Sequence, residues 1–145
     1  MKELCPRKSV GAIIERGGKI LLIDRVYPPL GWACPAGHVD EGKTPQDMLE
    51  IEVAEEVGLK VTSSELVFQE MIAWNNCWRN NDEGHYWYVY KAEAEGEVII
   101  NNSDHKEAEG YGWFKPREIQ HLDLEPVWRY FLEELGYIKS VGKIP

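Results

Sequence analysis

The sequence predicts a mixed α/β domain. Two apolar, strand-like runs precede a segment with strong helix boundary signals, further strand-like runs follow it, and an amphipathic segment lies near the end. Strands on both sides of a central helix, with a second helix after them, are typical of a sheet covered by helices. A chain of 145 residues with 43% hydrophobic residues can bury one such core but is too short for two, so we expect one domain over residues 1–145.

The first part of the chain reads as a hairpin followed by a structured loop. Lys8 to Glu15 and Ile20 to Val26 are apolar runs joined by a Gly-Gly turn. Tyr27 to Val39 contains too many proline and glycine residues for one regular element. We expect only short strand pieces there, around Trp32 and His38.

The central helix has clear signals at both ends. Thr44 is a plausible N-cap, Pro45 suits the first helical position, and Asp47 is an acidic residue in the first turn. Gly58 supplies the stop. The prediction is a helix over about Pro45 to Val57.

The remaining elements are expected from composition and periodicity. They are strands at Glu65 to Trp74 and His85 to Ala94, a short strand at Gly110 to Phe114, a helical turn at Pro116 to Ile119 and a closing helix at Glu125 to Leu135. No repeat or low-complexity tract interrupts this order.

Charge and cysteine content exclude several classes of protein. The formal net charge of −9, without a basic run, argues against a nucleic-acid polymer as partner, and an acidic protein that handles phosphates needs a bound cation. Cys5, Cys34 and Cys77 are odd in number and form no C-x-x-C pair, which favours a reducing cytoplasm. No run approaches the length of a membrane span, so we expect no membrane partner.

Three glutamates on the central helix form the strongest candidate site. Glu52, Glu55 and Glu56 stand at i, i+3 and i+4 and fall within an arc of about 100° of the helix surface. Carboxylates this close repel one another, so a neutralising partner is expected. Their hard oxygen atoms suit Mg²⁺ or Mn²⁺, and Mg²⁺ is commonly shared between carboxylates and substrate phosphates. A solvated acidic face is the alternative.

The surrounding residues resemble the Nudix box, G-x5-E-x7-R-E-U-x-E-E-x-G-U, in which U is aliphatic. Gly37-His38-Val39-Asp40-Glu41-Gly42-Lys43 opens the match, and Glu52-Val53-Ala54-Glu55-Glu56-Val57-Gly58-Leu59 closes it with the correct gap. The resemblance implies a MutT-like Nudix hydrolase with a single-domain α/β/α sandwich and a mixed sheet.

Two positions depart from the family pattern. Lys43 replaces the first glutamate of the box, and Ile51 replaces the arginine that orients the catalytic glutamates in the family. Our hypothesis is that the Lys43 side chain supplies positive charge near Glu55 or contacts a substrate phosphate. The alternative is a catalytically weakened Nudix-fold module that binds or senses a nucleotide.

The resemblance also implies a reaction and further site residues. Nudix enzymes hydrolyse a phosphoanhydride bond in a nucleoside triphosphate, or in a nucleoside diphosphate linked to another group, by metal-assisted attack of water on phosphorus. By this resemblance the three glutamates are metal ligands, with Glu52 or Glu56 also able to act as base. The Ala36 carbonyl is a further metal ligand, and Glu109, with Glu107 second, is a candidate base.

Substrate contacts are less sharply indicated. Arg25 could bind a phosphate bidentately, although a surface ion pair is an equal alternative. Aromatic and basic residues near the predicted strand ends are pocket candidates: Trp74, Trp78, Arg79, His85 and Trp87. The expected partner is a small nucleotide, and the many aromatic residues are compatible with a homodimer.

Overall fold

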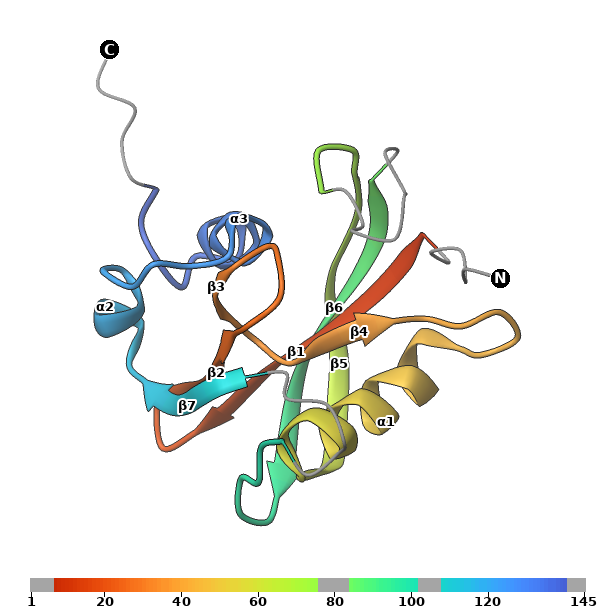
Figure 1. Cartoon of the computed structure of the whole chain (residues 1–145), viewed down its shortest axis with the longest axis horizontal. Helices are drawn as coiled ribbons and strands as arrows, with labels where there is room; N and C mark the ends of the chain where they lie inside the picture. The colour runs from red at the N-terminus through yellow and green to blue at the C-terminus, as the bar shows by residue number, and fades with distance from the viewer. Residues whose placement is uncertain (1–6, 76–83, 102–107, 141–145) are drawn as a thin grey trace.

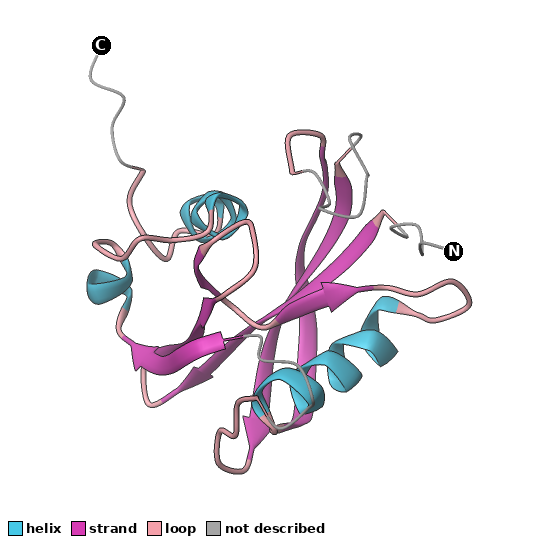
Figure 2. Ribbon diagram, in the orientation of Figure 1, coloured by secondary structure: helices cyan, strands magenta, loops and turns pink. Residues whose placement is uncertain are grey.

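The computed structural model describes residues 7–75, 84–101 and 108–140, which form a mixed sheet with helices against it (Figure 1, Figure 2). The strands are β1 (Lys8–Arg16), β2 (Lys19–Arg25), β3 (Gly31–Ala33), β4 (Ala36–His38), β5 (Lys60–Ile72), β6 (His85–Glu95) and β7 (Ala108–Phe114). The helices are α1 (Pro45–Val57), α2 (Pro116–Ile119) and α3 (Pro126–Glu134). No helix in these ranges is long and apolar enough to cross a membrane.

β1 is the strand on which the sheet is organised. It pairs in parallel with β6, and β6 pairs antiparallel with the outer strand β5. β4 pairs antiparallel with the start of β1, whereas β2 pairs with it only at the hairpin end, through Glu15–Ile20 and Arg16–Lys19. β2 then diverges to pair with β3 and β7. The predicted hairpin is therefore present, but it joins two parts of the sheet.

Side chains of β1 alternate between two hydrophobic clusters. Val10, Ala12 and Ile14 pack in the cluster on the α1 side, while Ile13 belongs to the cluster that contains α3 residues such as Phe131. Successive side chains of a strand point to opposite faces. The sheet therefore carries α1 on one face and α3 on the other (Figure 1), as expected for an α/β/α sandwich.

Most element boundaries agree with the sequence-based expectations, and the largest difference is in β5. This strand begins at Lys60, five residues before the predicted start at Glu65. The added residues include the exposed, polar Thr62 and Ser63, which lie on an outer strand and carry no hydrophobic signal. β5 ends at Ile72 and not at the predicted Trp74, because a turn begins at Ala73. β7 starts at Ala108, two residues earlier than predicted, and α3 starts at Pro126.

Candidate active site

α1 is held at both ends by its own sequence. The Thr44 hydroxyl oxygen accepts a hydrogen bond from the Asp47 backbone N–H at 3.1 Å. Gly58 adopts a left-handed conformation with φ of 69°, and its N–H donates to the Ala54 carbonyl oxygen at 3.0 Å. These contacts satisfy backbone groups that a helix end leaves unpaired. The local sequence therefore defines where α1 begins and ends.

The buried face of α1 decides where the three glutamates point. The helix docks on the sheet through Met48, Leu49, Val53 and Val57. At 100° per residue, this docking turns Glu52 and Glu56 toward one flank and Glu55 toward solvent. Glu52 and Glu56 are half-buried and Glu55 is exposed. The predicted face of three carboxylates is thus divided into a pair and a more distant third member.

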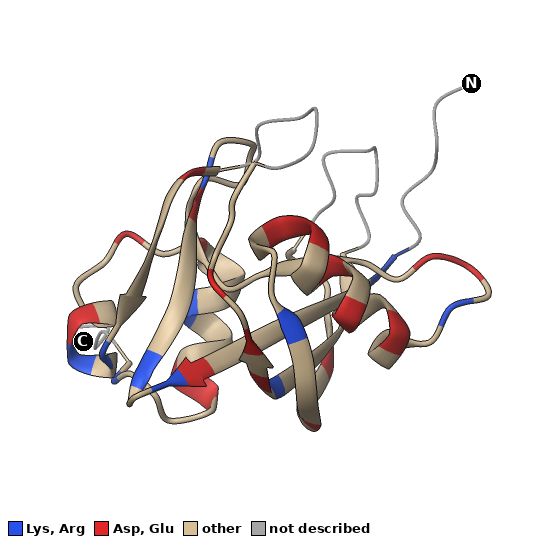
Figure 3. Cartoon of the chain, turned by 90° about the horizontal axis from the view of Figure 1, so that it is seen from below, with Lys and Arg blue, Asp and Glu red and all other residues tan. Residues whose placement is uncertain are grey.

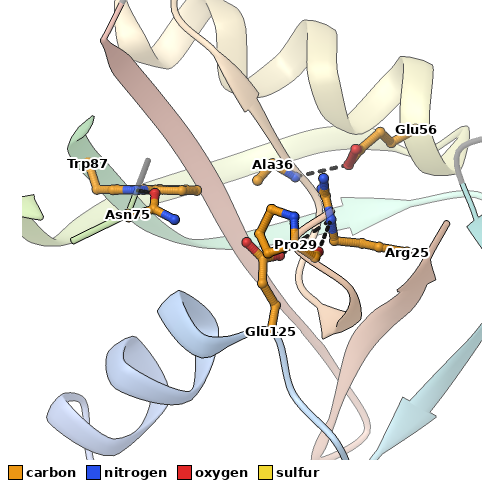
Figure 4. Close-up of polar contacts among 7 residues, drawn as sticks. All are labelled: Arg25, Pro29, Ala36, Glu56, Asn75, Trp87 and Glu125. Atoms are coloured by element: carbon orange, nitrogen blue, oxygen red, sulfur yellow. Dashed lines mark hydrogen bonds and ion pairs between the residues drawn. The ribbon is translucent and has the colours of Figure 1, made fainter. Parts of the chain in front are cut away.

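Glu52 and Glu56 both lie against β4. The Ala36 backbone N–H donates to Glu56 Oε1 at 2.9 Å (Figure 4). A Cβ atom on Gly37 would lie 2.6 Å from Glu52 Cγ and closer still to the carboxyl group, so the Glu52 side chain occupies the space that a glycine leaves open. β4 is positioned by pairing of Ala36 with Gly11 in β1. The central strand of the sheet therefore positions the backbone on which the two carboxylates rest.

The Glu52 and Glu56 carboxylates fit a hard divalent cation. In the parts of the chain that the structure describes, no three His, Cys, Asp or Glu side chains are grouped closely enough to hold a metal ion by themselves. Mg²⁺, however, commonly uses one or two carboxylates and completes its shell with water and substrate phosphate oxygens. Acidic positions follow one another along α1 (Figure 3). The donor set is suitable, and the assignment of Glu55 and the Ala36 carbonyl as further ligands stays a prediction.

The two departures from the box consensus are both at the surface. Lys43 is exposed, and its backbone N–H closes a turn onto the Asp40 carbonyl oxygen at 3.0 Å. Within residues 7–75, 84–101 and 108–140, the Lys43 ammonium forms no ion pair with any glutamate of α1. Ile51 leaves 38% of its surface exposed. The structure thus provides no positive charge beside Glu55 from either position, and contact of Lys43 with a substrate phosphate stays a prediction.

A pocket of about 110 Å³ opens beside β4 and shares its backbone with the glutamate pair. Ala36 and Gly37 line this pocket and also contact Glu56 and Glu52. The other lining residues come from β1, β2, β4, β6, α3 and the connecting loops: Ser9, Arg25, Pro29, His38, Asn75, His85, Trp87, Glu125 and Trp128. The glutamate pair and the pocket are therefore adjacent parts of one site.

Glu125 and Arg25 form an ion pair in the pocket, in which Glu125 is buried and Arg25 is half-buried. Arg25 Nε lies 3.5 Å from Glu125 Oε2 and donates to the Pro29 carbonyl oxygen at 3.1 Å (Figure 4). Glu125 is 5% exposed. Burial raises the pKa of its carboxyl group to about 7, although the positive charge of Arg25 acts in the opposite direction. Near neutral pH this carboxyl group is present in both protonation states, as expected of a functional group in a cleft.

The opposite wall of the pocket is a hydrogen-bonded set of uncharged groups. The Trp87 indole Nε1–H donates to Asn75 Oδ1 at 2.7 Å (Figure 4), and His85 Nδ1 lies 2.7 Å from the Asn75 carbonyl oxygen. A carbonyl oxygen can only accept, so Nδ1 carries the proton. Burial lowers the pKa of His85, which favours the neutral imidazole. His38 stacks on His85 with ring centroids 5.5 Å apart.

The structure brings some predicted substrate residues together and separates others. Trp87, only 6% exposed, lines the pocket and packs against Trp128 and Phe131 in the core. Trp74 is 53% exposed, contacts the Tyr130 ring edge-on and does not line the pocket. Glu109 is exposed on β7. Arg79, Trp78 and Glu107 lie outside the described residues.

Sequence analysis did not single out Glu125 or Asn75. A signal for Glu125 was present, because Pro126 suits a first helical position and makes the preceding residue the N-cap. Glutamate is not a favoured N-cap, and the Glu125 side chain makes no capping hydrogen bond. The Glu125 carboxylate pairs with Arg25 instead. Asn75 follows a strand in a polar stretch and carried no comparable signal.

Residues 6–135 match the family model of the NUDIX domain, and the chain belongs to this family. It is a hydrolase that acts on acid anhydrides. The predicted resemblance is confirmed, as is the fold.

The relatives agree with this class. An RNA pyrophosphohydrolase from Gluconobacter oxydans is 26% identical over 133 residues, covering 81% of this chain and 76% of the relative. Nucleoside triphosphatase NudI from Escherichia coli is 26% identical over 147 residues, covering 91% of this chain and 98% of the relative. The solved structure of a MutT NUDIX hydrolase from Burkholderia pseudomallei is 28% identical with a TM-score of 0.65, covering 89% and 97% of the two chains.

Proposed function

We propose that this protein hydrolyses a phosphoanhydride bond in a nucleoside triphosphate, or in a nucleoside diphosphate linked to another group, with Mg²⁺ or Mn²⁺ as cofactor. The observation that carries the proposal is the gathering of Glu52 and Glu56 over β4, with Glu56 held by the Ala36 N–H at 2.9 Å. A pair of fixed carboxylates can hold a cation that an acidic chain needs to bind a diphosphate.

Glu52 and Glu56 are the proposed metal ligands, together with Glu55 and the Ala36 carbonyl. A divalent cation, when bound, supplies Lewis acidity, an activated water and a template for the phosphates. The Ala36 N–H orients the Glu56 carboxylate, since charge-assisted hydrogen bonds fix both distance and direction. Gly37 permits the close approach of the Glu52 side chain. Preorganisation of this kind lowers the reorganisation needed during the reaction.

The proton acceptor for the attacking water is proposed among nearby carboxylates. Glu52 or Glu56 serves this role if one oxygen of its carboxylate remains directed at the water, and Glu109 on β7 is the alternative from outside α1. Lys43, exposed on the loop before α1, is proposed to contact a phosphate. A cytoplasmic location, a homodimer and the one-domain boundary 1–145 remain predictions.

A panel assay for phosphate and pyrophosphate release tests the proposal. The panel contains the common nucleoside triphosphates, nucleotide sugars, ADP-ribose and a 5′-triphosphorylated RNA, which the pyrophosphohydrolase relatives make relevant. We expect turnover that needs Mg²⁺ or Mn²⁺, is abolished by a chelator and falls about 100-fold or more in Glu52→Gln and Glu56→Gln.

Glu50→Gln is the matched control, because Glu50 is an exposed glutamate of the same helix on another face. Its turnover should equal that of the unmodified protein. A silent panel accompanied by tight nucleotide binding would instead support the alternative, a binding or sensing module. Turnover that persists after chelation would refute the metal requirement.

A further inference from the structure

The Asn101 side chain holds the backbone at the start of β7. Its Nδ2 amide donates to the Ala108 carbonyl oxygen at 2.8 Å, and its Oδ1 atom accepts from the Ala108 N–H at 3.1 Å. Asn101 has a left-handed backbone with φ of 58°, a conformation that asparagine adopts more readily than most residues. We call this pair of hydrogen bonds the amide clamp. It fixes Ala108 relative to the segment that ends at Asn101.

The segment before the amide clamp, residues 96–101, is itself anchored on the end of α1. The Ile99 N–H donates at 2.9 Å to the carbonyl oxygen of Val57, the last residue of α1. Val98 and Ile100 pack against the hydrophobic cluster to which the buried face of α1 belongs. Through the amide clamp, the start of β7 is therefore tied to the helix that carries the glutamate pair.

The residue that follows Ala108 lies in a β-bulge. Arg25 of β2 pairs with Ala108, whereas the preceding Asp24 pairs with Gly110, so β7 contains one extra residue, Glu109. A bulge changes the direction of a side chain relative to a regular strand, and bulges are common beside active sites. The direction of a bulged residue depends on how the backbone on each side of it is held. On the N-terminal side, that backbone is held by the amide clamp.

This end of β7 lies beside the candidate active site. Arg25, which pairs with Ala108, also lines the pocket whose wall Ala36 and Gly37 share with the glutamate pair. Ala108 is buried in the same cluster as the apolar face of α1, and β7 begins at its end nearest α1 (Figure 1). Glu109 is exposed, so water can reach its carboxylate. A carboxylate in this position is suited to accept a proton from water.

We propose that Asn101 is a positioning residue that directs the Glu109 carboxylate to the attacking water. This inference rests on the proposed function and takes Glu109 as the proton acceptor among the carboxylates named there. The water oxygen forms a bond to phosphorus, the bond from phosphorus to the leaving phosphate oxygen breaks, and the Glu109 carboxylate takes a proton from the water. Proton transfer requires the base within hydrogen-bonding distance of that water. Asn101 maintains this distance through the backbone of Ala108.

Asn101→Gly in the full-length protein tests the inference, because glycine keeps the left-handed backbone and removes only the side chain. With Mg²⁺ and the panel nucleotide that is hydrolysed fastest, we expect kcat to fall about 10–100-fold. KM, and the affinity for Mn²⁺ measured by calorimetry, should stay within about twofold, because the glutamate pair is not displaced. The loss in kcat should shrink about tenfold or more between about pH 7 and about pH 9, since hydroxide does not need a base.

Gln120→Ala is the matched control for a purely structural role. The Gln120 amide makes the same pair of contacts with the backbone of Lys139, donating to its carbonyl oxygen at 2.9 Å and accepting from its N–H at 2.6 Å. These residues lie at α2 and after α3, away from α1 (Figure 1). The variant should therefore leave kcat and its pH profile unchanged.

A second background shows whether Asn101 acts through Glu109. In Glu109→Gln, the further change Asn101→Gly should cost less than about twofold in kcat. An unchanged kcat in Asn101→Gly, an equal loss in both backgrounds, or a loss that is the same at both pH values would overturn this inference alone. If Asn101→Gly does not fold, Asn101→Asp, which keeps the acceptor and loses the donor, decides by the same measurements. A silent panel for the unmodified protein would instead refute the proposed function, and this inference with it.

Discussion

Replacement of Gly37 by alanine tests whether the position of the Glu52 carboxylate matters for the reaction. The added Cβ would lie 2.6 Å from Glu52 Cγ and closer to the carboxyl group, whereas an ordinary contact begins at 3.4 Å. The Glu52 side chain must therefore move by at least about 0.8 Å at Cγ, and further at its end. The backbone of Gly37 does not have a positive φ, so alanine itself is tolerated there.

The expected effect is on activity and not on stability. Displacement of a catalytic group by about 1 Å can cost about 100-fold in rate, and we expect a loss of that size in kcat/KM for metal-dependent phosphate release. The free energy of unfolding should change by less than about 1 kcal/mol, because the atoms that must move belong to a flexible, half-buried side chain. Gly110→Ala on β7 is the matched control, since its Cβ would meet no atom within 4 Å.

A double-mutant cycle shows whether the effect passes through Glu52. If Gly37→Ala acts by displacing this carboxylate, it should cost almost nothing further in a Glu52→Gln background. Full activity of Gly37→Ala would refute the reasoning. An equal loss in both backgrounds would show that Gly37 acts by another route.

Four further predictions concern stability and the loop before α1. Gly11→Ala places a Cβ 2.6 Å or less from the fully buried ring of Trp128, which cannot move aside. The free energy of unfolding, measured with urea, should therefore fall by about 1–3 kcal/mol, and an unchanged midpoint would contradict this. Thr44→Ala removes the N-cap contact and should cost about 1 kcal/mol in the same assay. Because Lys43 is exposed, Lys43→Ala should change the free energy of unfolding by less than about 0.5 kcal/mol. An increase in KM would then reflect the loss of a substrate phosphate contact and not a loss of folded protein. Burial raises the pKa of Glu125 from 4.5 to about 7, so the folded protein binds a proton that the unfolded chain has already released in this pH range. The free energy of unfolding should therefore fall as pH rises between these two values and level off above them. Glu125→Gln should remove up to about 3 kcal/mol of this decline, measured as thermal unfolding against pH.

Elements with local signals were predicted closely, and those that depend on neighbours were not. The helix Pro45–Val57 agrees with its prediction because Thr44 and Gly58 mark its ends in the sequence itself. The first part of β5, with Thr62, is polar and forms a strand only because β6 provides hydrogen-bonding partners. Edge strands of this kind have no hydrophobic face that periodicity can detect.

The three glutamates of α1 show the same division between local and tertiary information. Spacing alone placed Glu52, Glu55 and Glu56 on one arc of a helix, because the geometry of an α-helix is the same wherever it packs. Docking of α1 through its buried residues then turned Glu52 and Glu56 to β4 and left Glu55 exposed. The periodicity of the sequence does not predict which glutamates face β4, because this depends on which strand lies beside the helix.

The sequence by itself determined the family, the order of elements and the acidic helix face, since these depend on residues close together in the chain. Only the tertiary structure paired Arg25 with Glu125, which are 100 residues apart, and enclosed them with Asn75 and two tryptophans in one pocket. Burial in that pocket raises the pKa of Glu125, and burial is a property of the assembled fold rather than of any local segment.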